Sequence, residues 1–169
     1  MVKRILPIAA VLCAVSVIVM VIALTAGEKS DSFSPPPFET NAQSGTPNVP
    51  EDAGYGQMDA KEFLFSAAGE LTVNDGSVDV WLTNPKENTV WLKVRILDES
   101  GNILGESGLI KPNEYVRSVK LNAVPKSTEN VSLKIMAYEP ETYYSAGSAA
   151  LNTVLTVQGT DSPLKEEAK

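Results

Sequence analysis

The feature that most constrains the fold of this chain is the alternation of apolar and polar residues with a period of two. Residues 77–83 and 89–97 show it most clearly, and the first of these runs places Val78, Val80 and Leu82 at every second position. Successive side chains of a β-strand point to opposite faces of a sheet, so this alternation predicts strands with one buried face. A helix would need apolar residues three and four positions apart, and no segment after residue 27 shows that spacing convincingly. The pattern therefore predicts an all-β fold.

Similar short runs recur about every ten residues after Lys61, separated by clusters of Gly, Pro, Asn and Asp, a rhythm typical of an antiparallel β-sandwich or barrel. A chain of 169 residues allows one domain with appendages. We assign residues 61–159 to a β-sandwich domain and residues 160–169 to a disordered tail. The seven expected strands cover residues 62–67, 77–83, 89–97, 103–106, 115–121, 131–138 and 151–157.

An uncharged apolar run covers residues 5–26 and follows Lys3 and Arg4. As a helix it would span about 33 Å at about 1.5 Å per residue, enough to cross the hydrocarbon core of a bilayer. Cleavage as a signal peptide, which would secrete the protein, is the alternative, but such peptides have shorter apolar regions and a better cleavage pattern. We predict a transmembrane signal-anchor over residues 1–27, with the lipid bilayer contacting residues 5–26. The positive-inside rule then leaves the N-terminus cytoplasmic and the C-terminal domain extracellular.

The residues between the anchor and the β domain, 28–60, include five prolines and several serines and glycines. This composition predicts a disordered, proline-rich linker that lifts the domain away from the membrane. Residues 35–37 are all proline and are expected to be locally extended. They lack the flanking basic residues of common proline-rich ligands, which favours the spacer interpretation.

Charge and composition exclude several functions. Twelve basic and 21 acidic residues follow Gly27, so the exported part has a net charge of −9, which argues against nucleic acid as a partner. The chain has no histidine and a single cysteine, Cys13, which excludes the usual histidine-dependent catalytic and metal sites and an intrachain disulfide. We expect no enzyme, no cofactor and no metal, and keep a carboxylate-based hydrolase as a remote alternative. Residues 98–102 resemble part of a calcium loop without its spacing, so a hairpin turn is expected there.

The two tryptophans, Trp81 and Trp91, lie at positions that the alternation assigns to the polar face. If both runs form one hairpin around residues 84–88, Trp81 faces Trp91 and Asp79 faces Lys93, an arrangement that stabilises paired strands. Two exposed rings could also stack on sugars, which would make this a carbohydrate-binding module. In an immunoglobulin-like topology the two strands often belong to different sheets, and then the tryptophans would be separated.

Three tyrosines, Tyr138, Tyr143 and Tyr144, surround the acidic segment 139–142. An aromatic and acidic loop of this kind is a candidate contact for a ligand or a partner protein. Alternatively, the tyrosines close the end of the sandwich by packing against it. The candidate contact residues are therefore Trp81, Trp91, Tyr138, Tyr143 and Tyr144.

Several segments together resemble a known kind of surface protein: residues 84–88 (NPKEN), 98–102 (DESGN), 106–116 (ESGLIKPNEYV) and 138–140 (YEP). The chain is similar to small immunoglobulin-like β-sandwich proteins of Gram-positive, clostridial-type bacteria, which follow an N-terminal membrane segment. Asn113 stands where that pattern usually has glycine. The resemblance implies an immunoglobulin-like antiparallel β-sandwich at the cell surface. We expect a non-catalytic cell-envelope module for protein–protein interaction or a structural role, with an envelope protein or a glycan as the possible partner.

Overall fold

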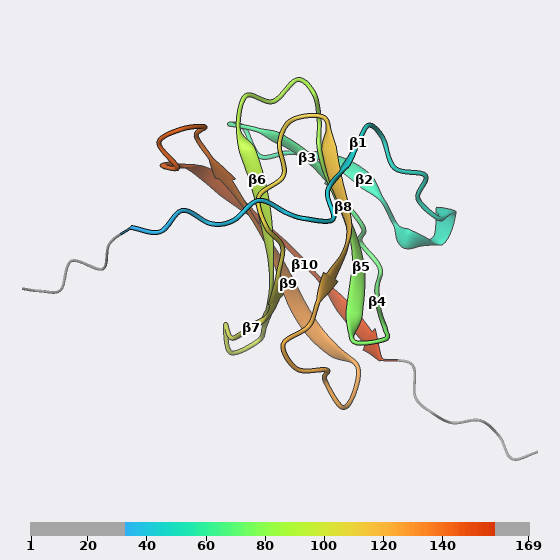
Figure 1. Cartoon of the computed structure of the whole chain (residues 1–169). Coiled ribbons are helices and arrows are strands. Elements are labelled where there is room, and N and C mark those ends of the chain that lie inside the picture. The colour runs from blue at the N-terminus through green and yellow to red at the C-terminus, as the bar shows by residue number, and fades with distance from the viewer. Residues whose placement is uncertain (1–32, 158–169) are drawn as a thin grey trace, which may run out of the picture. The chain divides into compact units, whose positions relative to one another are not determined.

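The computed structural model describes residues 33–157, and the chain separates into two compact units, residues 1–35 and 36–169. Within the second unit, the described residues form strands, turns and one short 3-10 helix (Figure 1). The predicted anchor and the predicted tail lie outside the described residues. None of the helices within residues 33–157 has the length and apolar character needed to span a bilayer.

The all-β prediction is confirmed, and all seven expected strands are present; six have small shifts of their ends or none, and the last, β10, begins six residues earlier than expected. The strands β1, β2 and β4 were not expected. The elements in chain order are β1 (Gln43–Ser44), η1 (Glu51–Ala53), β2 (Gly56–Asp59), β3 (Leu64–Ala67), β4 (Leu71–Asn74), β5 (Ser77–Asn84), β6 (Trp91–Asp98), β7 (Ile103–Glu106), β8 (Glu114–Lys120), β9 (Glu129–Tyr138) and β10 (Ser145–Val157).

The strands form one mixed sheet that curls round on itself (Figure 1). The order along it is β1-β8-β5-β4-β10-β9-β6-β7, and β3 joins β5 at one point while also pairing with β2. All the strand pairs are antiparallel except that of β4 with β10, which is parallel. A bridge between Gly105 and Leu121 brings β7, the last strand of this order, beside the end of β8, the second.

The apolar positions named by the alternation fill the inside of this curl. The core residues expected from β5, β6 and β9 are buried, as are Val116 and Val119 of β8. A β-bulge lies between Asp79 and Leu82 of β5, opposite the segment of β8 between these two valines. Burial of β-branched and leucine side chains provides most of the favourable free energy of folding in such a domain. The buried set is Val78, Val80, Leu82, Val90, Leu92, Val94, Ile96, Val116, Val119, Val131, Leu133 and Ile135.

The connection between β5 and β6 is an arch and not a hairpin turn, because the two strands pair with different neighbours. The fully buried amide of Asn84 holds this arch: its nitrogen donates to the carbonyl oxygens of Val90 (2.9 Å) and Ile110 (3.1 Å). Its oxygen accepts from the side-chain amide of Asn88 at 2.7 Å, and Asn88 in turn hydrogen-bonds both backbone groups of Leu64. Two asparagines therefore close the arch through Val90 and tie it to two other segments of the domain, those of Leu64 and Ile110.

Residues 36–60 are ordered, so the expectation of a disordered linker over residues 28–60 is wrong for this part. We call residues 36–45 the N-terminal strap: β1 pairs with β8, and Phe38 forms a parallel bridge with Leu109. The carboxylate of Glu39 accepts a hydrogen bond of 2.7 Å from the backbone N–H of Gly108. Further along, β2 pairs with β3. The sequence did not predict these contacts, because backbone pairing over two to four residues leaves no periodicity to detect.

Candidate functional site

The tryptophans do not form the cross-strand pair expected from a hairpin. Trp81 lies on β5, which pairs with β3, β4 and β8, whereas Trp91 begins β6, which pairs with β7 and β9. Asp79 likewise faces Arg117 (3.0 Å) and not Lys93. The predicted clamp is therefore wrong, and so is a sugar-binding platform made of two adjacent tryptophans. The alternative topology, in which an arch separates the two strands, is the one observed.

Trp81 is a packed residue of the β5 bulge. Its backbone has a φ of 48°, an unfavourable conformation for a bulky side chain that surrounding contacts must hold in place. Its ring stacks on Tyr115, with centroids 6.4 Å apart, and the guanidinium of Arg117 lies 5.1 Å from its centroid. Only 8% of Trp81 is exposed. This ring stabilises the pairing of β5 with β8 and offers little surface to a ligand.

Trp91 is the centre of a second, partly exposed group that we call the aromatic cluster: Phe38, Trp91 and Tyr143. The ring centroids of Phe38 and Trp91 are 4.8 Å apart, and those of Trp91 and Tyr143 are 5.2 Å apart. Both pairs are edge-to-face, the geometry that aromatic quadrupoles favour. The ammonium group of Lys111 lies 4.8 Å from the Phe38 centroid. The cluster thus joins the strap, the start of β6 and the β9–β10 loop.

The β9–β10 loop is fixed in an unusual conformation beside this cluster. Glu141 and Tyr143 have φ angles of 67° and 58°, a region that residues other than glycine rarely occupy. Backbone hydrogen bonds hold it, from the N–H of Glu139 to the oxygen of Tyr144 (2.8 Å) and from the N–H of Tyr143 to the oxygen of Glu139 (3.0 Å). Tyr144 is 71% exposed, while Tyr138 lies opposite Trp91 and is half-buried. Strain of this kind is typical of sites where a side chain must be presented in one direction.

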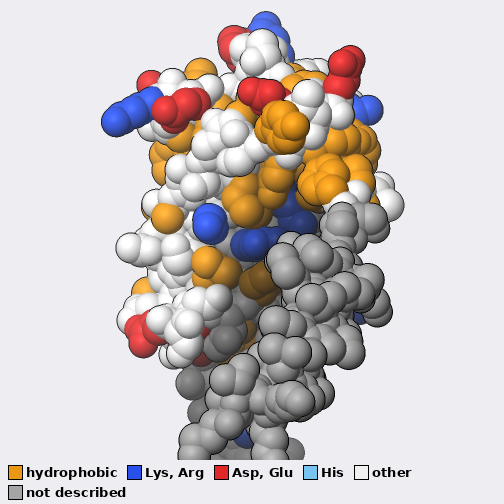
Figure 2. Space-filling model, turned by 90° about the vertical axis from the view of Figure 1, so that its left-hand side faces the viewer, with side chains coloured by type: hydrophobic (Ala, Val, Ile, Leu, Met, Phe, Trp, Pro, Cys, Tyr) orange, Lys and Arg blue, Asp and Glu red, His pale blue; other side chains and the backbone are white. Residues whose placement is uncertain are grey.

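Basic side chains lie on the same strand as Trp91. Lys93 is buried and its ammonium is 2.9 Å from a carboxylate oxygen of Glu106, whose other oxygen is 2.7 Å from Arg95 Nε. Partial burial raises the pKa of Glu106, but the hydrogen bonds and charges of Lys93 and Arg95 outweigh it and lower the pKa overall. Figure 2 shows the side of the molecule that carries β6 and β7, where hydrophobic side chains surround a small group of basic ones.

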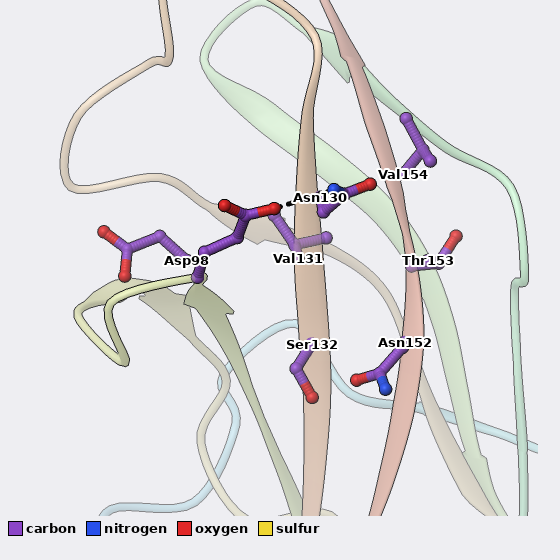
Figure 3. A pocket seen from close by; sticks show the side chains of 8 residues that line it. Asp98, Asn130, Val131, Ser132, Asn152, Thr153 and Val154 are labelled. Carbon is purple, nitrogen blue, oxygen red and sulfur yellow. Dashed lines mark hydrogen bonds between the residues drawn. The ribbon is translucent and has the colours of Figure 1, made fainter.

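An open hollow of about 530 Å³ lies on the strands β9 and β10 beside the turn after β6 (Figure 3). Six of its eight lining residues have polar side chains, including Ser132 and Asn152, which face each other on the two strands. Asp98 accepts hydrogen bonds from the backbone and side chain of Asn102, which lower its pKa. Residues 98–102 thus form the hairpin turn that was expected. Within residues 33–157 no group of three or more carboxylates and thiols is placed to hold a metal ion.

The structure brings together part of the predicted site. Trp91 contacts Tyr143 and lies opposite Tyr138, Tyr144 borders the same loop, and Trp81 belongs to a different part of the sheet. Phe38 was missed because it lies in the segment predicted to be disordered. An aromatic residue directly after three prolines was the available signal, since a disordered spacer has little use for one.

Comparisons with protein families, with curated proteins and with solved structures yield no match to this chain.

Proposed function

We propose that the protein is a non-catalytic module of the cell envelope, anchored in the membrane by residues 5–26, with its C-terminal domain outside the cell. The uncharged length of that run and the two basic residues before it support the anchor and its orientation. The observation that carries the role as a contact module is the aromatic cluster beside a strained loop, which presents an exposed tyrosine.

The domain is proposed to be an immunoglobulin-like β-sandwich of the kind found in Gram-positive surface proteins. Its strand pairs support this assignment: β5 pairs with β3 and β8, while β6 pairs with β7 and β9, and β9 with β10. The arch between β5 and β6 connects the two groups, as expected when consecutive strands belong to opposite sheets. The strand β4 pairs with both β5 and β10 and so links the groups.

The contact surface of the module is the end formed by the aromatic cluster and the β9–β10 loop. Tyr144 is 71% exposed, and the exposed residues Glu139 and Glu141 add negative charge beside it. Tyrosine contributes large contact area with few rotatable bonds, and a neighbouring charged rim adds selectivity. The favoured partner is therefore an envelope protein with an apolar pocket bordered by basic groups.

Localisation is tested separately from partner binding. A membrane-impermeant maleimide should label a cysteine placed at Tyr144 in intact cells of a Cys13→Ser variant, and should not label one placed at Val2. Alkaline carbonate should leave the full chain in the membrane fraction. Labelling at Val2, or release of the chain by carbonate, contradicts the proposed anchor.

Partner binding is tested with a photo-cross-linking amino acid at Tyr144 in cells. The matched control carries it at Val124, which is 49% exposed in the β8–β9 loop, at the other end of the domain (Figure 1). We expect a discrete protein adduct at position 144, none at 124, and loss of the adduct when Trp91→Ala removes the cluster. Equal adducts at both positions contradict the proposed surface. An adduct that glycosidases remove identifies a glycan as the partner instead.

A further inference from the structure

The strand β10 has an open backbone edge along most of its length. Its 13 residues pair with β9 from Ser145 to Leu155, but on the other side β4 pairs only with residues 155–157. Among residues 33–157, the only other hydrogen bond that β10 makes on that side runs from the Thr153 hydroxyl to the carbonyl oxygen of Gly69. A β-bulge at residues 145–147 ends the regular part. Residues 147–153 therefore present unpaired backbone groups.

Beyond the bulge at its start, this edge lacks the usual protection against pairing with another strand. Natural edge strands carry lysine, proline or inward-pointing charges that prevent association. From Tyr143 to Gly159 the chain contains no charged residue and no proline. The core-facing side chains of Ala149 and Leu151 pack against the hydrophobic core but remain partly exposed. An added strand would cover them and would satisfy the open backbone groups.

We propose that the occupant of this edge is a second copy of the same chain, whose β10 pairs antiparallel with β10 around a two-fold axis at Ala150. This register places Ser148 opposite Asn152 of the second copy on the outer face. On the core-facing side it places Ala149 opposite Leu151, so that polar residues meet polar ones and a small apolar residue meets a large one. A two-fold axis brings like charges together wherever the strand is charged, and this strand has none.

Neighbouring registers fit less well. An axis at Leu151 would place residue 147 opposite residue 155, where β4 already pairs with β10. An axis between two residues would set core-facing side chains against outward-facing ones, because the side chains of a strand alternate. An axis at Ala149 would place the polar Ser148 opposite Ala150, so that Ser148 and Asn152 of the second copy would no longer face each other. The axis at Ala150 is thus the register that the sequence of β10 favours. The pairing is independent of the aromatic cluster and of the partner proposed for it.

Disulfide trapping tests this register directly, in the full chain with Cys13→Ser. At the axis, the Cα atoms of the two Ala150→Cys residues, one from each chain, lie about 4.5–5.5 Å apart, within the range of a disulfide. In this register the two Ser148→Cys residues of a dimer are offset by four residues along the strands, about 13 Å at about 3.3 Å per residue, and so are the two Asn152→Cys residues. Mild oxidation should therefore cross-link Ala150→Cys alone, and a mixture of Ser148→Cys with Asn152→Cys should give a mixed dimer.

A charge placed on the axis provides the second test. Ala150→Lys should convert the detergent-solubilised full chain from dimer to monomer mass in light scattering. Thr156→Lys is the matched control, because it is exposed on the same strand where β4 already covers the edge, and it should remain dimeric. Circular dichroism should show both variants folded. The proposal is overturned if the wild-type chain is monomeric, if Ser148→Cys cross-links to itself as fast as Ala150→Cys, or if Ala150→Cys in cells traps a different protein.

Discussion

The buried amide of Asn84 offers the sharpest test of how the arch between β5 and β6 is held, because its hydrogen bonds can be counted. In Asn84→Ala the carbonyl oxygen of Val90 loses this donor, which costs about 1–3 kcal/mol for a buried polar group. The oxygen of Ile110 keeps its bond from the N–H of Leu92, and the amide of Asn88 keeps its bond to Leu64. Each of these groups loses one partner, at about 0.5–1.5 kcal/mol each. The expected loss of unfolding free energy is about 2–6 kcal/mol.

Urea unfolding of the full chain, followed by tryptophan fluorescence, measures this loss. With a slope of about 2 kcal/mol per molar urea, the midpoint should fall by about 1–3 M at unchanged slope. Asn74→Ala is the control, since this exposed residue ends β4, and its effect should stay within about 0.5 kcal/mol. Asn84→Asp should lose at least as much as Asn84→Ala at neutral pH, because it directs a second oxygen at two carbonyl oxygens. An Asn84→Ala midpoint equal to that of Asn74→Ala would refute the role given to this amide.

Three further predictions concern the strap, a turn and an ion pair. Gly108→Ala should release the strap, because an added Cβ would lie 2.5 Å from a strap backbone nitrogen. Hydrogen exchange and proteolysis within residues 36–45 should then become faster. The control Gly56→Ala should leave both rates unchanged, because a Cβ there would meet nothing within 4 Å. Asp75→Val should lower stability by about 1–3 kcal/mol, because Asp75 has a φ of 47° in the β4–β5 turn, whereas Asp75→Gly should be neutral or stabilising in thermal unfolding. Glu106→Gln should lower the melting temperature at pH 7. Because the folded protein lowers the pKa of Glu106, the carboxylate stabilises the fold fully above its ordinary pKa of 4.5, and this stabilisation disappears as the pH falls through the pKa of the folded state. The difference from wild type should therefore shrink at pH 3, and a constant difference would contradict the ion-pair explanation. Glu106 and Arg95 are partly exposed, which keeps the contribution of that contact small.

Local patterns predicted the strands well, because alternation depends only on neighbouring residues. The bounds of β7 match the expected residues 103–106, and the expected core positions are buried. The start of β10 was missed because Ser145–Ala150 consists of small residues with low β-propensity, which pairing with β9 nevertheless holds in a strand. Similarly, β1 and β2 have two and four residues, too few for a periodic signal.

Which strands pair with each other was harder to predict, because the choice rests on contacts between distant parts of the chain. The expected five-residue connection, residues 84–88, suits a hairpin as well as an arch. The feature that distinguishes the arch is the hydrogen bond from Asn84 to Ile110, 26 residues away. The same limit applies to the aromatic cluster. Trp91 and Tyr143 were both identified as candidate contacts, but their proximity depends on the β6–β9 pairing, and the role of Phe38 depends on the strap.

The strap has a consequence for the order in which the chain acquires its structure. Gln43 bonds to a residue 72 positions later, and Glu39 to one 69 positions later. At about 5–20 residues per second, synthesis takes roughly 4–14 s to deliver those partners after the strap has been made. The strap is thus among the earliest parts of the domain to be translated, but it cannot dock until the start of β8 has been made. A chain interrupted before Leu109 leaves Phe38 without its bridge to that residue, so incomplete products carry an undocked strap that quality-control proteases can recognise.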